Sequence, residues 1–342
     1  MNLPNGRILV TGGAGFIGSA LIHALNEIGH EDILVSDLLG STEKWRNLTP
    51  LRFADYVEAD QLLAKVENKD PFLNEIGLVL HLGACSSTME TDASYLVRNN
   101  YQYTASLARW ALNQDIRFVY ASSAATYGDG EQGMDDKSDD LAAFRPLNMY
   151  GYSKHMFDLH AQRSKWFGNI TGLKYFNVYG PNEDHKGEMR SLVNKAYHQI
   201  SETGRIKLFR SHQTDYKDGE QKRDFLYIKD AVAMTLHLAA TPKATGLYNI
   251  GSGKANTWIS LANAIFAAMA MEPQIDFIDI PESIREKYQY FTQADVTKLR
   301  EAGYEKPITP LSEAVKDYVQ NYLAKENRLG DQQIQPALRF LG

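Results

Sequence analysis

A tyrosine and a lysine stand four residues apart in the stretch NMYGYSK, residues 148–154. Positions four apart share one face of a helix, whereas positions two apart point about 200° from each other. Tyr150 and Lys154 can therefore face one cleft, and Tyr152 points elsewhere. A free tyrosine has a pKa near 10, and a nearby lysine ammonium would favour the phenolate and lower that pKa. The pair is a candidate acid/base group, although the same spacing is common on ordinary helix surfaces.

Two serines stand in the segment YASSAATYG, residues 120–128, where an apolar run ends. Ligands of parallel sheets bind at the carboxyl ends of the strands. Ser122 or Ser123 could therefore hold a substrate hydroxyl beside the tyrosine. The alternative is a strand-end hydroxyl that only caps the backbone.

The segment RILVTGGAGFIGSALIHAL, residues 7–25, predicts a strand, a glycine turn and a helix. Gly12, Gly15 and Gly18 fall where a dinucleotide-binding turn needs close approach of the backbone to a pyrophosphate. The N-terminus of the helix would supply unpaired N–H groups and a partial positive charge. The strand and helix on either side make this pattern more specific than glycine spacing alone.

An aspartate and a lysine follow the glycine turn, at a separation along the chain that is expected for residues that contact the adenosine ribose. Asp37 ends the second predicted strand, where a carboxylate binds ribose hydroxyls and favours NAD. Lys44 could neutralise a 2′-phosphate, which would favour NADP, or could be a solvated surface charge. The residues themselves leave the choice between NAD and NADP open.

The first half of the chain alternates short apolar runs with helical segments. We expect strands at Arg7–Val10, Asp32–Asp37, Leu78–Leu82, Arg117–Ser122 and Gly172–Phe176, with helices at Ile17–Ile28 and Tyr95–Asn113. This order predicts an α/β fold, a Rossmann-type doubly wound parallel sheet. RDFLYIKD (223–230) and GLYNIGSG (246–253) are expected to return to that sheet.

The remaining segments predict a smaller C-terminal α/β lobe that binds substrate. The dinucleotide domain would comprise residues 1–176 and about 223–251. The substrate lobe would comprise about 177–222 and 252–325, and residues 326–342 form a polar, peripheral tail.

Composition excludes several classes of protein. The 342 residues carry a net charge of −6, which argues against a nucleic-acid binder. Cys85 is the only cysteine, so neither an intrachain disulfide nor a cysteine-rich metal cluster is expected, in keeping with a reducing cytoplasm. Cys85 is expected to pack in the cofactor groove, and no metal site is expected. We see no signal peptide and no apolar run long enough to span a membrane.

The chain resembles the extended short-chain dehydrogenase/reductase family over about residues 7–325. Six motifs occur in the order found in that family: TGGAGFIG, HLGA, YASSAATYG, YGYSK, YFNVYGP and RDFLYIKD. The resemblance implies that Ser123 and Tyr150 are catalytic and that Lys154 is a catalytic, cofactor-binding lysine. It places Asn99 beside the cofactor and Arg223 at the diphosphate of a nucleotide sugar, which a guanidinium can bind with two hydrogen bonds.

The resemblance implies further ligand contacts. Besides the glycines, Asp37, Lys44, Asn99 and Lys154, the implied cofactor contacts are Phe16, Ile17, Leu38, Leu82, Gly83, Ala84, Cys85, Ser86, Val178 and Lys186. The implied substrate contacts are Asn177, Glu188, Lys195, Phe209, Arg210, Ser211, His212, Arg223 and Tyr288. Tyr288 could instead belong to the core of the smaller lobe. Leu38, Glu188 and Lys195 differ from the residues that some members carry at these positions.

The chain is similar to one subgroup of this family, whose members epimerise ADP-heptoses at C6 for lipopolysaccharide core assembly. The segments that carry this similarity are HLGACSST, NNYQY, LNMYGYSK, YFNVYGPNEDHKG and KYQYFTQAD. Oxidation to a ketone and return of hydride to its other face makes two acid/base groups plausible. The resemblance makes Lys186 the second group beside Tyr150. Without the resemblance, the polar loop around them indicates that Lys186 is a solvated loop lysine and that His185 is a solvated histidine. Ala124 and Ala125 stand where sugar dehydratases of the family carry acids, so dehydration is not expected.

On family grounds we expect NADP, an ADP-heptose substrate and a homo-oligomer, a pentamer by resemblance. An epimerase or reductase for another nucleotide sugar is the alternative enzyme. A dinucleotide-sensing regulator on the same fold is the alternative without catalysis. Such a sensor would not need Ser123, Tyr150 and Lys154 together.

Overall fold

A parallel sheet of seven strands forms the centre of the larger lobe. The computed structural model describes residues 2–285 and 288–331. The sheet order is β10-β6-β5-β4-β1-β2-β3, and every pairing in it is parallel. The strands are β1 (Arg7–Thr11), β2 (Ile33–Asp37), β3 (Asp55–Glu58), β4 (Ile76–His81), β5 (Arg117–Ser123), β6 (Ile170–Tyr175) and β10 (Gly246–Ile250). The doubly wound Rossmann-type fold is therefore confirmed.

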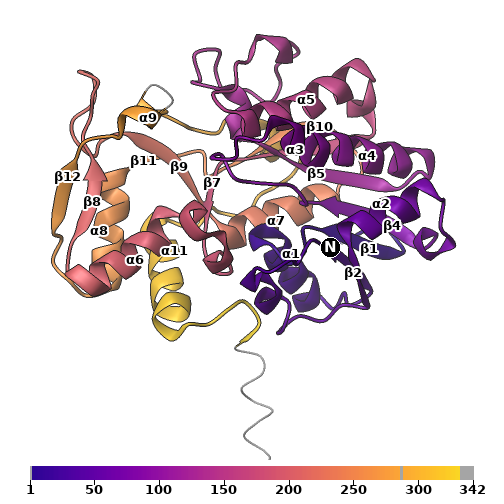
Figure 1. Ribbon diagram of the computed structural model, residues 1–342, viewed down its shortest axis with the longest axis horizontal. Coiled ribbons are helices and arrows are strands. Elements are labelled where there is room, and N and C mark those ends of the chain that lie inside the picture. The colour runs from indigo at the N-terminus through magenta and orange to yellow at the C-terminus, as the bar shows by residue number, and fades with distance from the viewer. Residues whose placement is uncertain (1, 286–287, 332–342) are drawn as a thin grey trace, which may run out of the picture.

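Helices cover both faces of this sheet (Figure 1). α1 (Phe16–Glu27) and α7 (Ile228–Ala239) lie together on one face. The other face carries α2 (Ala59–Glu67), α3 (Ala93–Leu96), α4 (Tyr103–Asn113) and α5 (Met149–Arg163). Alternate residues of β1 enter two separate hydrophobic clusters, with Ile8 and Val10 in one and Leu9 in the other. This alternation is why the buried strands are apolar throughout.

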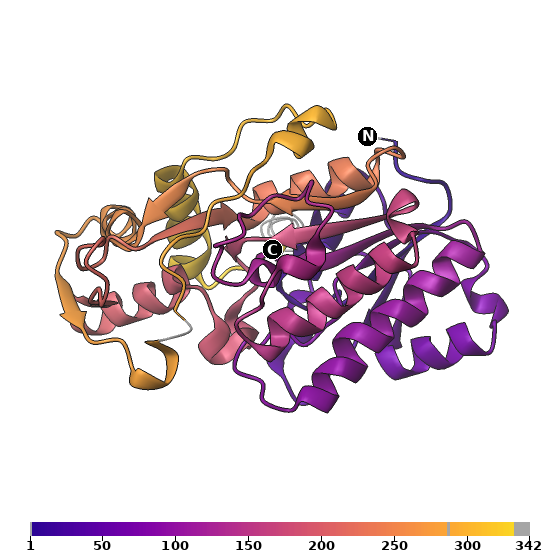
Figure 2. The ribbon, with the colours of Figure 1, turned by 90° about the horizontal axis from the view of Figure 1, so that it is seen from above.

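The smaller lobe lies beside the sheet (Figures 1 and 2). Its strands are β7 (Asn177–Tyr179), β8 (Ile206–Phe209), β9 (Lys222–Tyr227), β11 (Ala255–Thr257) and β12 (Ile275–Ile278). Its helices are α6 (Leu192–Thr203), α8 (Trp258–Ala268), α9 (Glu282–Arg285) and α11 (Leu311–Asp317), whereas α10 (Thr297–Glu301) packs against β10 of the large sheet. Shorter helical turns that bear on the site are η1 (Glu43–Asn47), η3 (Val97–Gln102), η4 (Ala124–Tyr127), η7 (Asp184–Met189) and η8 (Tyr318–Tyr322).

The two lobes share one hydrophobic core. The cluster that contains Ile8 and Val10 continues through α7 to Ile206, Leu261 and Val315 of the smaller lobe. A continuous core limits independent movement of the lobes. The domain boundaries given above stay a prediction. Of the expected tail, residues 332–342 lie outside the described part.

One expectation about the elements was wrong. The segment 223–230 does not return to the large sheet, because β9 pairs with β7 and β11 in a separate three-stranded sheet. The helical segment expected over Tyr95–Asn113 is confirmed, and a π-helical turn, η3, lies within it between α3 and α4. β3 and α2 were not expected, since β3 is short and mostly polar. The other expected strands, including 246–250, are confirmed within about two residues.

A buried ion pair joins α5 to the centre of the sheet. The Lys174 ammonium lies 2.7 Å from Asp158, and both side chains are fully buried. The carboxylate also accepts hydrogen bonds from Tyr120 (2.7 Å) and Ser122 (2.7 Å). Lys174 also donates to Thr126 (2.5 Å). This satisfied network holds α5 and the end of β5 in register, because an unpaired buried charge would be costly.

Lys174→Met is expected to lower the free energy of unfolding by about 3–5 kcal/mol, because Asp158 is left buried without its cation. Urea denaturation followed by circular dichroism measures the loss. The control is Lys137→Met, which breaks an exposed pair with Glu301 and should leave the unfolding midpoint unchanged. Equal losses in the two variants would contradict this prediction.

Candidate active site at the junction of the two lobes

The glycine turn after β1 is built for close backbone approach. Gly12 has a positive φ of 67°, and a Cβ there would lie 2.7 Å from the Gly83 nitrogen. A Cβ on Gly18 would collide with the Gly12 carbonyl oxygen. No described side chain caps α1, which begins after Gly15. The first N–H groups of this helix are therefore open to a phosphate.

A cavity of about 490 Å³ extends from this turn along the carboxyl ends of the strands. The expected site residues that line it are Gly12, Gly15, Phe16, Ile17, Gly18, Asp37, Lys44, Leu82, Gly83, Ala84, Cys85, Ser86, Tyr150, Lys154 and Lys186. We call this space the first cavity. Its length along the strand ends and its open amides fit a dinucleotide.

Three expected cofactor contacts do not line the first cavity. The Leu38 side chain is 45% exposed. The Asn99 amide donates to Asn100 (3.1 Å). Val178, on β7, lines a second cavity in the smaller lobe. The local turns of the backbone decide where the side chains of Leu38, Asn99 and Val178 point, and the sequence motifs alone do not show this.

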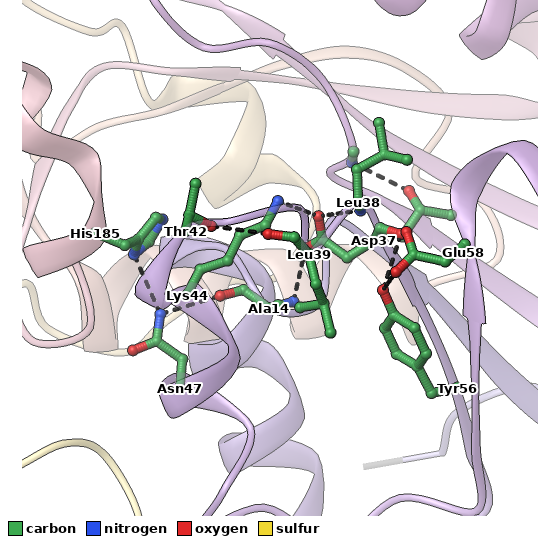
Figure 3. Close-up of polar contacts among 12 residues, drawn as sticks. Ala14, Asp37, Leu38, Leu39, Thr42, Lys44, Asn47, Tyr56, Glu58 and His185 are labelled. Atoms are coloured by element: carbon green, nitrogen blue, oxygen red, sulfur yellow. Dashed lines mark hydrogen bonds and ion pairs between the residues drawn. The ribbon is translucent and has the colours of Figure 1, made fainter.

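Asp37 and Lys44 form an ion pair at the adenosine end of the first cavity (Figure 3). Lys44 Nζ lies 2.6 Å from Asp37 Oδ1, which also accepts a hydrogen bond from the N–H of Leu38 (2.7 Å). Asp37 Oδ2 accepts one from the N–H of Ala14 (2.8 Å). Lys44 is only 17% exposed, so the interpretation as a solvated surface charge is wrong. An ammonium and a carboxylate therefore meet where ribose hydroxyls would bind.

Helix α5 carries Tyr150 and Lys154 into the first cavity. The Asn148 side chain caps the helix by accepting a hydrogen bond from the Gly151 N–H (2.8 Å). A Cβ on Gly151 would lie 2.7 Å from the Ala125 oxygen, so glycine lets α5 pack closely on η4. Tyr152 is 47% exposed and points away from the cavity. Tyr150 and Lys154 therefore face one cavity, as the helical spacing predicts, and the catalytic role of Tyr150 stays a prediction.

Burial controls the protonation of this group. Burial raises the pKa of Tyr150, while its hydrogen bond with Ser123 lowers that pKa. Burial lowers the pKa of Lys154 to about 8, and the nearby Asp158 charge opposes the shift. The Lys154 ammonium donates to the Ala121 carbonyl (2.9 Å). The expectation that Lys154 lowers the pKa of Tyr150 is therefore wrong for this structure, because burial outweighs other effects.

Ser123 ends β5 with its side chain mostly buried. Its Oγ accepts a hydrogen bond from the Ala125 N–H (3.1 Å), which caps η4. The Ser123 hydroxyl also lowers the pKa of Tyr150, against the effect of burial. The interpretation of Ser123 as a strand-end cap is confirmed, and its catalytic role stays a prediction.

Lys186 lies where two cavities meet, since it lines both. Its Nζ lies 5.3 Å from the centre of the Phe16 ring. Burial lowers the pKa of Lys186, and the Glu183 charge opposes that shift. The interpretation as a solvated loop lysine is wrong, because the turn η7 folds back over α1. Burial is the main cause of this shift in the pKa of Lys186.

His185 is also not solvated. It lines the first cavity, and its Nδ1 lies 3.3 Å from the side-chain nitrogen of Asn47 (Figure 3). Burial lowers its pKa to about 4, with the nearby Lys186 and Lys44 charges acting in the same direction. His185 is therefore a neutral ring at neutral pH.

The second cavity has a volume of about 810 Å³ and lies in the smaller lobe. The expected substrate residues that line it are Asn177, Glu188, Lys195, Phe209 and Tyr288. Arg210, Ser211 and His212 do not line it, because their polar groups turn toward Asp218, Gln213 and Tyr290.

Arg223 is buried behind the wall of the second cavity. Its guanidinium lies 5.3 Å from the ring centre of Tyr288 and 5.9 Å from that of Trp258, and both rings line the cavity. It donates to the carbonyls of Lys222 and Gln289. Within residues 2–285 and 288–331, no carboxylate lies within 4.0 Å of it. A desolvated guanidinium with that surrounding suits an anionic ligand.

Sequence reasoning missed Asn100, which joins three parts of the site. Its side chain is fully buried. It accepts from the Cys85 N–H (2.8 Å) and donates to the Cys85 carbonyl (2.9 Å) and to Ser153 (2.9 Å). Cys85 itself is a free, half-buried thiol. Asparagine is unfavourable inside a helix, so the pair of asparagines in RNNYQY was the available signal.

Other wall residues had no motif to mark them. Arg190, Gln199, Lys207 and Trp258 line the second cavity, and Met189 lines both cavities. No group of three or more histidine, cysteine, aspartate or glutamate side chains in the described ranges is placed to bind a metal ion. Helices long and apolar enough to cross a membrane are likewise absent from the part described.

Known proteins resemble this chain along most of its length. Residues 8–251 match the sequence model of the NAD dependent epimerase/dehydratase family. The chain is 50% identical over 317 residues to a protein of Nitratidesulfovibrio vulgaris named ADP-L-glycero-D-manno-heptose-6-epimerase, covering 92% of this chain and 98% of that protein. A protein of the same name from Fusobacterium nucleatum is 46% identical over 336 residues, covering 94% and 99%.

A crystal structure of the Helicobacter pylori ADP-L-glycero-D-manno-heptose-6-epimerase shares the fold, with a TM-score of 0.78 at 26% identity over 94% of this chain and 97% of that one. The family match covers more than half of the chain, and the relatives match nearly all of it. The chain belongs to the NAD-dependent epimerase/dehydratase family.

Proposed function

We propose that this chain is an isomerase that interconverts ADP-D-glycero-D-manno-heptose and ADP-L-glycero-D-manno-heptose at C6. The observation that carries the proposal is the position of Lys186, which lines both cavities and comes from a different segment than Tyr150. Inversion through a planar ketone exposes two faces, so two proton-handling groups from separate segments suit it. The names of the relatives support the substrate.

Two buried groups, Tyr150 and Lys186, are proposed to carry out the proton transfers. A bound nicotinamide dinucleotide supplies hydride acceptance and return at C6. Tyr150, held by Ser123, takes or gives the hydroxyl proton on one face, and Lys186 does so on the other. Burial favours the uncharged form of both groups, because it raises the pKa of Tyr150 and lowers that of Lys186. Lys154 is proposed to bind the ribose of the cofactor.

The nucleotide part of the substrate is proposed to bind in the second cavity. Arg223 would bind the diphosphate, since its buried guanidinium lies beside Tyr288 and Trp258. Asn177, Lys195 and Phe209 would form the wall around the sugar and adenosine. Arg210, Ser211 and His212 could reach a ligand only by giving up their present partners, and Glu188 would contribute mainly through its backbone, which accepts from Lys195 (3.1 Å).

The cofactor is proposed to be NADP. The family uses a nicotinamide dinucleotide, and the open N–H groups of α1 fit its pyrophosphate. Asp37 would bind ribose hydroxyls. Lys44, now 2.6 Å from Asp37, would neutralise a 2′-phosphate.

The product would supply heptose for lipopolysaccharide core assembly. A cytoplasmic location is proposed with it, supported by the single cysteine. A homo-oligomer, a pentamer by resemblance to the subgroup, completes the proposal.

The direct test incubates the purified protein with ADP- and UDP-sugars and follows the C6 and C4 configurations by NMR. Inversion at C6 of ADP-heptose supports the proposal. Inversion of UDP-sugars at C4 without action on ADP-heptose would replace it with a 4-epimerase. Bound dinucleotide without turnover of any sugar would favour the sensor.

Tyr150→Phe is expected to lower the turnover number by about 100-fold or more, because the phenolic proton is lost. The content of bound dinucleotide should stay the same. Tyr152→Phe, two residues away on the exposed face, is the matched control and should keep wild-type turnover. Wild-type turnover in Tyr150→Phe would remove this tyrosine from the mechanism.

Lys186→Met keeps much of the side-chain volume and removes the amine. Epimerisation is expected to fall by about 100-fold or more, because one face of the ketone loses its proton donor. Lys316→Met, an exposed lysine of α11, is the control. If epimerisation continued at the wild-type rate, Lys186 would have no part in proton transfer.

Lys44→Ala is expected to shift the bound cofactor from NADP toward NAD by about tenfold, since the 2′-phosphate loses its cation. Denaturing the purified protein and separating the released dinucleotides measures the ratio. Lys65→Ala, which breaks another lysine–aspartate pair of the same lobe, should leave the ratio unchanged. Release of NAD alone from the wild-type protein would contradict the choice of NADP.

A further inference from the structure

A buried carboxylate lies three residues before Lys186 in the same turn. The Glu183 side chain is fully buried. Its Oε2 accepts a hydrogen bond from the Ser191 N–H (2.6 Å), and its Oε1 accepts from the Ser191 hydroxyl (2.6 Å) and from the Tyr318 hydroxyl (3.0 Å). Burial of a carboxylate is costly unless such donors surround it. The carboxylate therefore binds both ends of η7 and joins them to η8.

The residue before Glu183 ties the same turn to three further elements. Asn182 is buried and has a positive φ of 77°. Its side chain donates to Ser19 of α1 (3.0 Å), and its Oδ1 accepts from the Leu329 N–H (3.0 Å). Its carbonyl accepts from the Asn47 side chain (3.1 Å). The start of the turn is thus held by groups far apart in the sequence.

The link from Glu183 to Lys186 is short. The Lys186 N–H donates to the Glu183 carbonyl (3.0 Å), which closes the turn. Beyond Lys186 the chain returns to the same carboxylate at Ser191. Lys186 therefore sits in a loop whose two ends are bound by one side chain.

Charged and titratable groups surround Lys186 on several elements. Its own loop supplies Glu183, Asp184, His185, Glu188 and Arg190, and the cavities supply Asp37, Lys44, Cys85, Tyr150, Lys154 and Lys195. Of the described groups, the Glu183 carboxylate is the negative charge that opposes the effect of burial on the pKa of Lys186.

We propose that Glu183 is a positioning residue for Lys186: its carboxylate fixes the turn that carries Lys186 against Ser191 and Tyr318. This inference rests on the proposed function, in which Lys186 transfers a proton. The carboxylate does not line either cavity, so it acts through Lys186.

Glu183→Gln keeps the shape and one acceptor oxygen and removes the charge. Without that negative charge the ammonium is less favoured, so the pKa of Lys186 falls. The limb of the kcat–pH profile that needs neutral Lys186 should then move to lower pH by about one unit. The kcat at the wild-type optimum should fall by about fivefold or more, because the turn that carries Lys186 is held less firmly at Ser191 and Tyr318, with KM changed less than about twofold.

A readout that does not depend on turnover follows the amine itself. The purified holoenzyme is treated with acetic anhydride at a series of pH values, and acetylation of Lys186 is measured by mass spectrometry. In Glu183→Gln the midpoint of labelling should move to lower pH by the same amount as the kinetic limb. Asp184→Asn, the adjacent exposed carboxylate, is the matched control and should leave the midpoint and kcat unchanged.

The outcomes separate this inference from the proposed function. A shifted labelling midpoint with unchanged epimerisation would support the coupling of Glu183 to Lys186 and remove Lys186 from the mechanism. An unshifted midpoint would overturn the inference, whatever the activity.

If Glu183→Gln does not fold, Tyr318→Phe tests the same carboxylate by removing one hydrogen-bond donor. It should lower kcat by about threefold or more at constant dinucleotide content. An unchanged kcat in that variant would overturn the inference.

Discussion

Desolvation is the interaction on which the candidate site depends. It raises the pKa of Tyr150 and lowers those of Lys154 and Lys186. In each case burial is the largest cause, and a neighbouring group opposes it. A proton-transfer group works best when its two forms are close in free energy. Removing water brings the two amines toward that balance, whereas it moves the Tyr150 phenol away from it, and Ser123 acts in the opposite direction on that phenol.

Burial of charged groups makes demands on the surrounding structure. Asp158 and Lys174 pair beneath the carboxyl end of β5, and Glu183 accepts hydrogen bonds from Ser191 and Tyr318. Both networks are satisfied, so they add specificity of position at little cost in unmet hydrogen bonds. The rigid backbone near the cavities follows from these networks and from the close packing at Gly12, Gly18 and Gly151.

The shared hydrophobic core explains how two distant segments meet. One cluster runs from the sheet through α7 into the smaller lobe. The turn η7 lies at this seam and brings Lys186 over Phe16 of α1. The junction therefore places Lys186 where the two cavities meet.

Local patterns in the sequence determined the parts of this protein that depend on neighbouring residues. The glycines after β1, the spacing of Tyr150 and Lys154 and the alternation of apolar strands with helices all follow from backbone geometry over a few residues, and the structure has them. The π-helical turn and the pairing of β9 did not follow, because they depend on contacts with other elements. Tertiary structure alone decided the burial of Lys186 and His185, the role of Asn100 and the setting of Arg223 between two rings. Their partners come from segments tens to more than one hundred residues away, and the environment of a side chain is set by those partners and by the water that they exclude.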